Sequence, residues 1–264
     1  LMTVRISESL GIKKILELSK KLEIYEEIPE LLSVSLGSAE TTLLNLTSAY
    51  ASFANGGKKI KPILIDKIQD RRGKTIFNSD KRMCIGCDRF SENSSEIPKI
   101  KDSFEQVFSE ETAYQMTSIL EGAVKRGTGK KLRDLKVPLA GKTGTTNNNF
   151  DAWFIGFSSN LVVGVYIGFD NPESLGKYET GSKAALPIFK DFVKKALYID
   201  DFKEFVAPSG IYFSSINYDT GKQEKFNSPK AIVEAFKLKG INSMKNTYLE
   251  DHNYDKLIKF RQFY

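Results

Sequence analysis

Three consecutive runs of strand-forming residues, at 137–146, 151–158 and 161–169, constrain the fold of this chain more than any other feature. The last two runs are separated by a Ser-Ser-Asn tripeptide, which is typical of a tight turn. The runs themselves are almost continuously apolar, and this is the pattern of strands that are covered on both faces. The sequence therefore predicts a central sheet that is buried on both faces.

Four segments carry apolar residues at helical spacing: 3–22, 41–54, 110–126 and 184–198. We expect Gly11 to divide the first segment into two helices, because glycine interrupts a helical pattern. The last helix is expected to pack on the sheet through one apolar face. That face comprises Ile188, Phe189, Phe192, Val193, Ala196 and Leu197.

The predicted helices begin and end at residues with matching chemistry. Thr41 or Thr42 is a candidate N-cap of the second helix and Ser109 of the third, since a hydroxyl there accepts an otherwise unpaired N–H. Asn-Gly-Gly follows the second helix and Gly-Thr-Gly the third, and both are typical helix ends. Pro187 is compatible with the last helix because it falls in the first turn.

The segments between and after these elements carry fewer sequence signals of secondary structure. Residues 63–68 and 75–77 are predicted to pair as two strands across an Arg-Arg-Gly-Lys turn, and 78–104 is predicted to be a loop or small insertion. We place the main domain at 1–200 and an appendix at 201–264.

The appendix is predicted to contain three parts. Residues 211–218 with the turn Asp-Thr-Gly suggest a small hairpin. Ser228-Pro229 is expected to begin a short helix that ends at Gly240. The polar residues 241–264 are expected to form a mobile tail.

Charge and hydropathy limit the classes of partner that this protein can bind. The 264 residues carry a formal charge of +6, but lysine is scattered and there is no dense arginine stripe, which argues against a nucleic-acid binder. A mildly positive surface suits an anionic cell-wall polymer or a membrane surface instead. The longest apolar run, 161–169, is about half of what a membrane-spanning helix needs. The first residues are amphipathic and unlike a signal peptide, so we expect any export or anchoring signal to lie outside this chain.

Two cysteines, Cys84 and Cys87, form a lone Cys-x-x-Cys. A zinc site would need further ligands, and the single histidine, His252, is far away in sequence. A thioredoxin-like site would need a helix start, whereas these residues lie in a polar segment. We interpret the pair as a structural disulfide or as two free thiols, with the disulfide favoured in an exported protein. No metal and no cofactor is expected.

The residues with the clearest chemical pattern are Lys142, Thr143, Gly144 and Thr145, at the end of the first strand run. Lys-Thr-Gly is one of three short motifs that serine β-lactamases and penicillin-binding proteins share; the others are Ser-x-x-Lys and Ser-x-Asn. A strand edge of this composition suits acyl transfer on an acyl-D-Ala-D-Ala peptide. Lys142 supplies positive potential and helps to relay protons, and the hydroxyls of Thr143 and Thr145 bind the terminal carboxylate. Gly144 lets the substrate backbone approach, and the Thr145 N–H is a candidate oxyanion donor.

Other matches to these motifs are interpreted as chance. Ser174 and Lys177 match Ser-x-x-Lys, but they follow Lys142 and lack a helix start. Ser-x-Asn occurs at Ser91, Ser158 and Ser215; the first lies in a polar loop and the other two again follow Lys142. In proteins with these three motifs the nucleophile motif comes first and Lys-Thr-Gly comes last. No nucleophilic serine is therefore assigned in this sequence.

Long flanking runs resemble the transpeptidase domain of class A, bifunctional penicillin-binding proteins. They read ETAYQMTSILEGAVKRGTGKKL, VPLAGKTGTTNNNFDAWFIGF and LVVGVYIGFDNPESLG, with LGSAETTLLNLTSAYASFANGGKKIKP before them and KAALPIFKDFVKKAL after them. The resemblance covers residues 1–220. It implies an α/β (α+β) fold of the β-lactamase/transpeptidase type, with an antiparallel sheet flanked by helices and a helical lobe across the cleft, incomplete at its N-terminal side.

The resemblance also implies what accompanies this segment in the parent protein. A segment like LMTVRI follows directly on Ser-x-Asn in this family, so that motif, the Ser-x-x-Lys nucleophile, a glycosyltransferase domain and a membrane anchor are expected outside the chain. The parent would cross-link peptidoglycan stem peptides on the periplasmic side of the inner membrane, bind β-lactams, and bear on cell shape and antibiotic resistance. The membrane would then be reached only through that anchor. Trp153 is expected to pack in the core or the cleft wall.

Several functions remain open at this stage. The chain is either the C-terminal part of a D,D-transpeptidase that is inactive alone, or a non-catalytic binding or structural module, including the product of a decayed gene. A D,D-carboxypeptidase or β-lactamase is less consistent with the flanking runs. A Ser-His-Asp hydrolase is weaker again, because His252 lies in the predicted tail.

If a nucleophile-bearing helix and part of the sheet lie outside this chain, apolar faces and a strand edge are exposed. We therefore expect low stability, or association of the chain with a partner or with itself. Sedimentation equilibrium and thermal unfolding test this expectation. A monomer with one cooperative transition at an ordinary mesophile temperature would contradict it.

Overall fold

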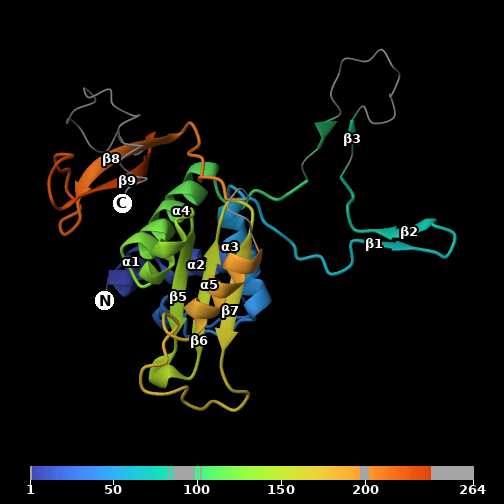
Figure 1. Ribbon diagram of the computed structural model, residues 1–264, viewed down its shortest axis with the longest axis horizontal. Helices are drawn as coiled ribbons and strands as arrows, with labels where there is room; N and C mark the ends of the chain where they lie inside the picture. Colours follow the sequence, from blue (N-terminus) through green and yellow to red (C-terminus); the bar gives the residue numbers. More distant parts are fainter. Residues whose placement is uncertain (1, 83, 86–98, 102, 197–201, 239–264) are drawn as a thin grey trace.

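The computed structural model describes residues 2–82, 84–85, 99–101, 103–196 and 202–238. Its regular elements follow one another as helices, an extended hairpin, a sheet with its flanking helices, and a C-terminal strand pair (Figure 1). In chain order they are α1 (Met2–Leu10), α2 (Ile12–Lys21), η1 (Leu32–Leu36), α3 (Leu43–Ala54), β1 (Lys67–Gln69), β2 (Thr75–Asn78), β3 (Cys84–Ile85), β4 (Lys99–Ile100), α4 (Glu110–Lys125), η2 (Lys130–Leu135), β5 (Ala140–Thr145), η3 (Asn147–Asn149), β6 (Ala152–Phe157), β7 (Val162–Ile167), α5 (Ala185–Ala196), β8 (Ile211–Asn217) and β9 (Ala231–Lys237).

The centre of the fold is an antiparallel sheet in the order β5-β6-β7. α5 covers one face, where a Cβ added at Gly156 would lie 2.6 Å from Phe189. α3 covers the other, where a Cβ at Gly164 would lie 2.1 Å from the Thr47 hydroxyl. The strands carry no side chain at these two points, so the helices pack close to the sheet. The predicted sheet with helices on both faces is confirmed.

Each face of the sheet has its own apolar core. On the α5 face, Phe154 and Phe189 are buried with ring centroids 4.8 Å apart, and Leu132 and Leu186 join them. On the opposite face Phe157 is buried with residues of α3 and α4, namely Leu120, Tyr50 and Phe53. Burial of aromatic side chains of this size is a major favourable contribution to folding. The two cores hold the three strands between two helical layers.

The helix boundaries follow the sequence signals. Gly11, with a φ of 83°, separates α1 from α2 as expected. Thr42 accepts a hydrogen bond from the Asn45 N–H at 3.1 Å, so Thr42 is the cap of α3. Ser109 caps α4 through the Thr112 N–H at 3.3 Å. These predictions hold because capping depends on contacts within one turn of helix.

The predicted pairing of two outer strands across the Arg-Arg-Gly-Lys turn is confirmed, with Ile68 opposite Phe77, but two predictions on exposed apolar residues are wrong. The first outer strand begins at Lys67, and residues 63–65 before it are exposed and unpaired in the described part of the chain. On α5 the buried residues are Ala185, Leu186, Phe189 and Val193, whereas Ile188 and Phe192 are 51% and 49% exposed. Ala196 is also exposed, and Leu197 lies outside the described residues. The buried residues of α5 recur at spacings of three and four, from Leu186 to Phe189 to Val193, and form a narrower stripe than expected.

The predicted helix after Ser228 is instead a strand, β9, that pairs antiparallel with β8 along its whole length. Ala231, Val233 and Ala235 alternate as buried residues. The pair packs on α4, where Gln115 donates to the Ala235 carbonyl at 3.1 Å and Arg126 pairs with Glu234 at 2.6 Å. The hairpin predicted at 211–218 is thus half of a longer pair, and the predicted tail at 241–264 lies outside the described residues.

The disulfide interpretation is confirmed at Cys84, which is disulfide-bonded; Cys87 lies outside the described residues. No described helix is long and apolar enough to cross a bilayer.

A hairpin segment leaves the sheet-and-helix body after α3 and returns before α4 (Figure 1). The two ends of this segment meet where it joins the body, at a junction that we call its root. There the Lys59 N–H donates to the Glu105 carbonyl at 2.8 Å and the Val107 N–H to the Gly57 carbonyl at 2.9 Å. The Gln106 side chain donates to the carbonyls of Gly56 and Phe108 at 2.8 and 2.7 Å. This set of hydrogen bonds fixes the point where the hairpin segment meets the body.

A small substitution at Gly57, which lies at this root, is expected to have a large effect on stability. Its φ is 87°, and a Cβ would lie 2.0 Å from the Phe108 carbonyl oxygen. We expect Gly57→Ala to lower the free energy of unfolding by more than about 2 kcal/mol, because strain and a backbone clash add. Gly73→Ala is the matched control: its φ is 81°, but nothing lies within 4 Å. Urea denaturation measures both, and equal losses would contradict the clash.

Candidate functional site

Lys142, Thr143, Gly144 and Thr145 lie together on β5, as the sequence predicted. β5 pairs with β6 along one side, from Ala140 opposite Phe157 to Thr145 opposite Ala152. Its other side pairs with no strand in the described part of the chain. The motif is therefore carried on an open strand edge, where the N–H and C=O groups of alternate residues are available to an extended ligand.

The pairing determines which groups face that edge. The Thr146 N–H donates to the Asp151 carbonyl at 3.2 Å, so residue 146 points its backbone groups toward β6. Because backbone groups alternate along an antiparallel strand, those of Thr143 and Thr145 point outward. The Lys142 ammonium donates to the Thr143 carbonyl at 2.8 Å, which agrees with this direction. The Thr145 N–H, the candidate oxyanion donor, is thus on the open edge.

The motif side chains divide between the two faces of the sheet. Lys142 and Gly144 share a face with Trp153, whereas Thr143 and Thr145 share the face that α5 covers, since opposite residues in an antiparallel pair lie on one face. The ammonium and the two hydroxyls can thus meet one ligand only along the edge of β5. Lys142 and Thr145 are exposed and Thr143 is half-buried.

Trp153 forms the wall beside Gly144. A Cβ at Gly144 would lie 3.0 Å from the Trp153 Cβ, so glycine here makes room for the indole. The indole is half-buried and packs on Tyr166 with ring centroids 4.7 Å apart. The Tyr166 hydroxyl donates to Asp151 at 2.9 Å, and this hydrogen bond raises the pKa of Tyr166. Trp153 therefore packs against a ring that is itself held by a carboxylate.

Two residues outside the predicted site contact the motif hydroxyls. Thr128, just after α4, shares a hydrogen bond of 2.8 Å with the Thr143 hydroxyl. The Gly181 N–H donates to the Thr145 hydroxyl at 3.1 Å. In the sequence, Thr128 and Gly181 could have been identified from the tripeptides Gly-Thr-Gly and Thr-Gly-Ser, because glycine often marks a close backbone approach. A hydroxyl offers one proton and two lone pairs, so each threonine keeps hydrogen-bonding capacity for a ligand.

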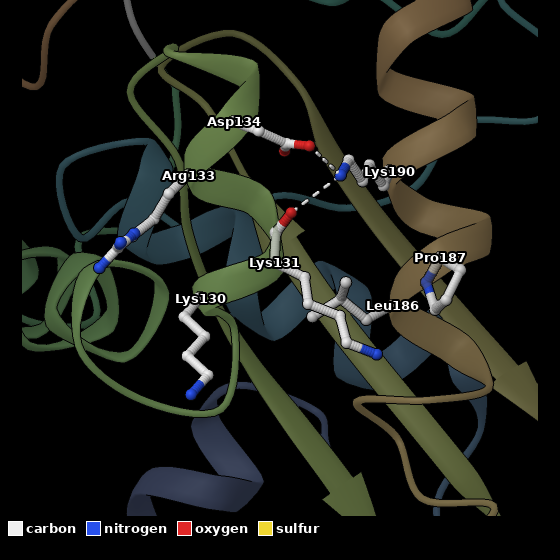
Figure 2. Close-up of a pocket in the computed structure, with 7 residues that line it drawn as sticks. All are labelled: Lys130, Lys131, Arg133, Asp134, Leu186, Pro187 and Lys190. Atoms are coloured by element: carbon white, nitrogen blue, oxygen red, sulfur yellow. Dashed lines mark hydrogen bonds and ion pairs between the residues drawn. The ribbon is translucent and has the colours of Figure 1, made fainter.

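A cavity of about 630 Å³ lies between η2 and the start of α5 (Figure 2). Its lining is basic: Lys130, Lys131, Arg133 and Lys190, with Asp134, Leu186 and Pro187. Lys190 is held between the Lys131 carbonyl at 2.9 Å and the Asp134 carboxylate at 2.5 Å, and this contact lowers the pKa of Asp134. Lys131 reaches the Ser182 carbonyl at 3.2 Å, so the cavity borders the segment that contacts Thr145.

Two of the serines that match the family motifs, Ser174 and Ser158, form local hydrogen bonds. Ser174 donates to the Asn148 carbonyl at 2.9 Å and lies in a loop, and Ser158 organises the turn before Leu161. Ser215 lies on β8, and Ser91 and His252 are outside the described residues. Within the described segments no group of three His, Cys, Asp or Glu side chains is placed to hold a metal ion.

Comparison with known proteins gives consistent relatives. Residues 4–194 match the penicillin binding protein transpeptidase domain. Penicillin-binding protein 1A of Rickettsia prowazekii is 41% identical over 257 residues, which are 96% of this chain and 32% of that protein. Penicillin-binding protein 1A of Pseudomonas aeruginosa is 32% identical over 268 residues, covering 90% and 33%. The chain thus spans about a third of the length of these curated relatives.

The fold agrees with the sequence comparison. The crystal structure of penicillin-binding protein 1A from Haemophilus influenzae superposes with a TM-score of 0.75 at 30% identity, over 90% of this chain and 38% of that one. The expected transpeptidase-like architecture is therefore confirmed for the segment that this chain contains.

The close approach of the Gly181 segment to β5 can be tested by substitution. A Cβ there would lie 2.3 Å from the Trp153 carbonyl oxygen and 2.5 Å from that of Gly144. We expect Gly181→Ala to lift its segment off β5, lower the free energy of unfolding by about 1–3 kcal/mol and abolish hydrogen-exchange protection of the residue 181 N–H. Lys183→Ala, at an exposed position of the same segment, is the control. Retained protection in Gly181→Ala would show that the close approach is absent.

Proposed function

Because this chain belongs to the penicillin-binding protein transpeptidase domain family, we propose that it forms one wall of a serine acyl-transfer site for peptidoglycan stem peptides. The observation that carries the proposal is the open edge of β5, where Lys142 and the outward backbone groups of Thr143 and Thr145 lie side by side. An edge of this kind binds an extended peptide as an added strand. The acyl-D-Ala-D-Ala end of a stem peptide is such a ligand.

Each motif residue has a separate task in this proposal. Lys142 leaves the Thr143 carbonyl, to which it donates at 2.8 Å, and turns its charge toward the carboxylate end of the peptide. The hydroxyls of Thr143 and Thr145 bind that carboxylate. Gly144 has no side chain to project from β5 beside Trp153, so the peptide backbone can lie against the strand.

The Thr145 N–H is proposed to stabilise the oxyanion that forms when the peptide carbonyl is attacked. A backbone N–H that is fixed by strand pairing is already oriented before the reaction, and this preorganisation is the basis of oxyanion stabilisation. β-Lactams are proposed to bind along the same edge, since they also present an acyl carbonyl next to a carboxylate.

We propose that the acylated serine belongs to a Ser-x-x-Lys segment outside the 264 residues of this sequence. The share of the relatives that the chain spans, about a third, is compatible with this arrangement. Ser158 and Ser174 are engaged in turns and are poor candidates for a nucleophile. In the longer protein the reaction would be cell-wall cross-linking on the outer side of the inner membrane, with consequences for cell shape and β-lactam resistance.

The proposal predicts no covalent adduct on this chain alone. A fluorescent penicillin is incubated with the purified chain, and labelling is read after denaturing electrophoresis and by intact mass. We expect no acyl adduct, because no Ser-x-x-Lys precedes Lys142 in this sequence. A stable, stoichiometric adduct would show that the nucleophile is present in this sequence.

A second arm of the same experiment separates an enzyme part from a non-catalytic module. The relatives' upstream transpeptidase segment is co-expressed with this chain, and labelling of that segment is measured. We expect labelling that falls by about 100-fold with Lys142→Ala in this chain, given the usual cost of losing one electrostatic group. No labelling with correctly folded partners would favour a binding or structural module.

A further inference from the structure

The hairpin segment that leaves the body after α3 contains a stretch, residues 61–82, that we call the basic arm. Residues 61–69 are all exposed, and so are both strands of the hairpin, β1 and β2. Figure 1 shows this hairpin standing away from the sheet and its helices. Two paired strands with both faces in solvent bury little apolar area, so the arm gains little stability from its own packing.

The basic arm carries most of the net charge of the chain. Its seven Lys or Arg and three Asp leave a formal charge of +4, against +6 for all 264 residues. Arg71, Arg72 and Lys74 cluster at the tip, and no ion pair joins them to an acidic side chain in the described part of the molecule. Asp70, the acid nearest to them in sequence, accepts the backbone N–H groups of Arg72 and Lys74 at 2.8 and 2.9 Å.

The same arm exposes aliphatic and aromatic side chains that a solvated surface does not require. Leu64 is 98% exposed, and Ile63 and Ile65 beside it are 62% and 51% exposed. On the hairpin, Ile68 lies opposite Phe77, and Ile76 is 65% exposed. Apolar residues gathered in one exposed segment usually mark an interaction site.

We propose that the basic arm docks on the surface of an anionic lipid bilayer. Its exposed apolar side chains enter the headgroup region, while the cations at the tip contact anionic headgroups. A purely anionic polymer would use the cations and leave Leu64 and its neighbours in water. An anionic bilayer satisfies both features, since basic and apolar residues contribute jointly to binding at its interface. The hydrogen-bonded root at Gly57 and Val107 couples this contact to the body.

This contact differs from an anchor. The arm contains polar residues such as Gln69 and Asn78 within the same short strands, so the hairpin lies at the interface and does not span the bilayer. It adds a second attachment to whatever anchor the longer protein has, and it does not depend on the proposed acyl-transfer function.

The test is a flotation assay with the full chain. The chain is mixed with vesicles of phosphatidylcholine alone or with 30 mol% phosphatidylglycerol, and floated protein is separated from aggregate on a density gradient. We expect binding to the anionic vesicles and little to the neutral ones. Arg71→Ser/Arg72→Ser/Lys74→Ser should weaken the partition coefficient by tenfold or more, because each basic residue near the surface contributes separately.

Matched variants make each part of the proposal falsifiable. Lys203→Ser/Lys222→Ser/Lys225→Ser removes the same charge from exposed positions on the rest of the chain and should change binding by less than about threefold. Leu64→Ser/Ile76→Ser should also weaken binding, whereas Leu36→Ser/Val206→Ser, at exposures of 63% and 86%, should not. Circular dichroism checks that each variant is folded.

Four outcomes would overturn the proposal. They are equal binding to neutral vesicles, equal loss from the arm and control triple variants, no effect of Leu64→Ser/Ile76→Ser, and binding to soluble poly-glutamate as tight as binding to the vesicles. The last two would identify the arm as a site for a soluble polyanion or an acidic protein.

Discussion

The pairing of β5 with β6 is the interaction on which the rest of this structure depends. Six consecutive residue pairs, from Ala140–Phe157 to Thr145–Ala152, join the motif strand to β6 along one side. This pairing directs the backbone groups of Thr143 and Thr145 outward. It also sets which side chains share a face, so that Lys142 lies with Trp153 and the two threonines lie with α5. Site and fold therefore share one set of hydrogen bonds.

Close packing on both faces protects that arrangement. Phe189 sits over Gly156 on one face, and Thr47 sits over Gly164 on the other, at distances that leave no room for a Cβ. Gly181 lies equally close to the backbone of Gly144 and Trp153. Because interiors of this density resist added volume, a small displacement of a helix is transmitted to the strand. The motif is thus positioned by residues that take no part in its proposed chemistry.

The molecule combines a packed body with a projecting basic arm. In the body, Lys190 forms an ion pair with Asp134. In the arm, the tip cations form no ion pair within the described residues, and the apolar side chains have little cover. The two parts meet at a hydrogen-bonded root. A body that holds a strand edge and an arm that contacts a surface would together orient the edge relative to that surface.

The sequence by itself determined the elements whose causes are local. It placed the three strands, the break at Gly11, the caps Thr42 and Ser109, and the motif on β5, because each depends on neighbours within a few residues. It failed at β9, where pairing with β8 and packing on α4 decide the structure. It also failed at half of the α5 face, where packing against the sheet decides which residues are buried. Only the tertiary structure brought Thr128 to Thr143 and Gly181 to Thr145, across 15 and 36 residues. No local pattern specifies such contacts, since they arise only when helices and strands have packed into one body.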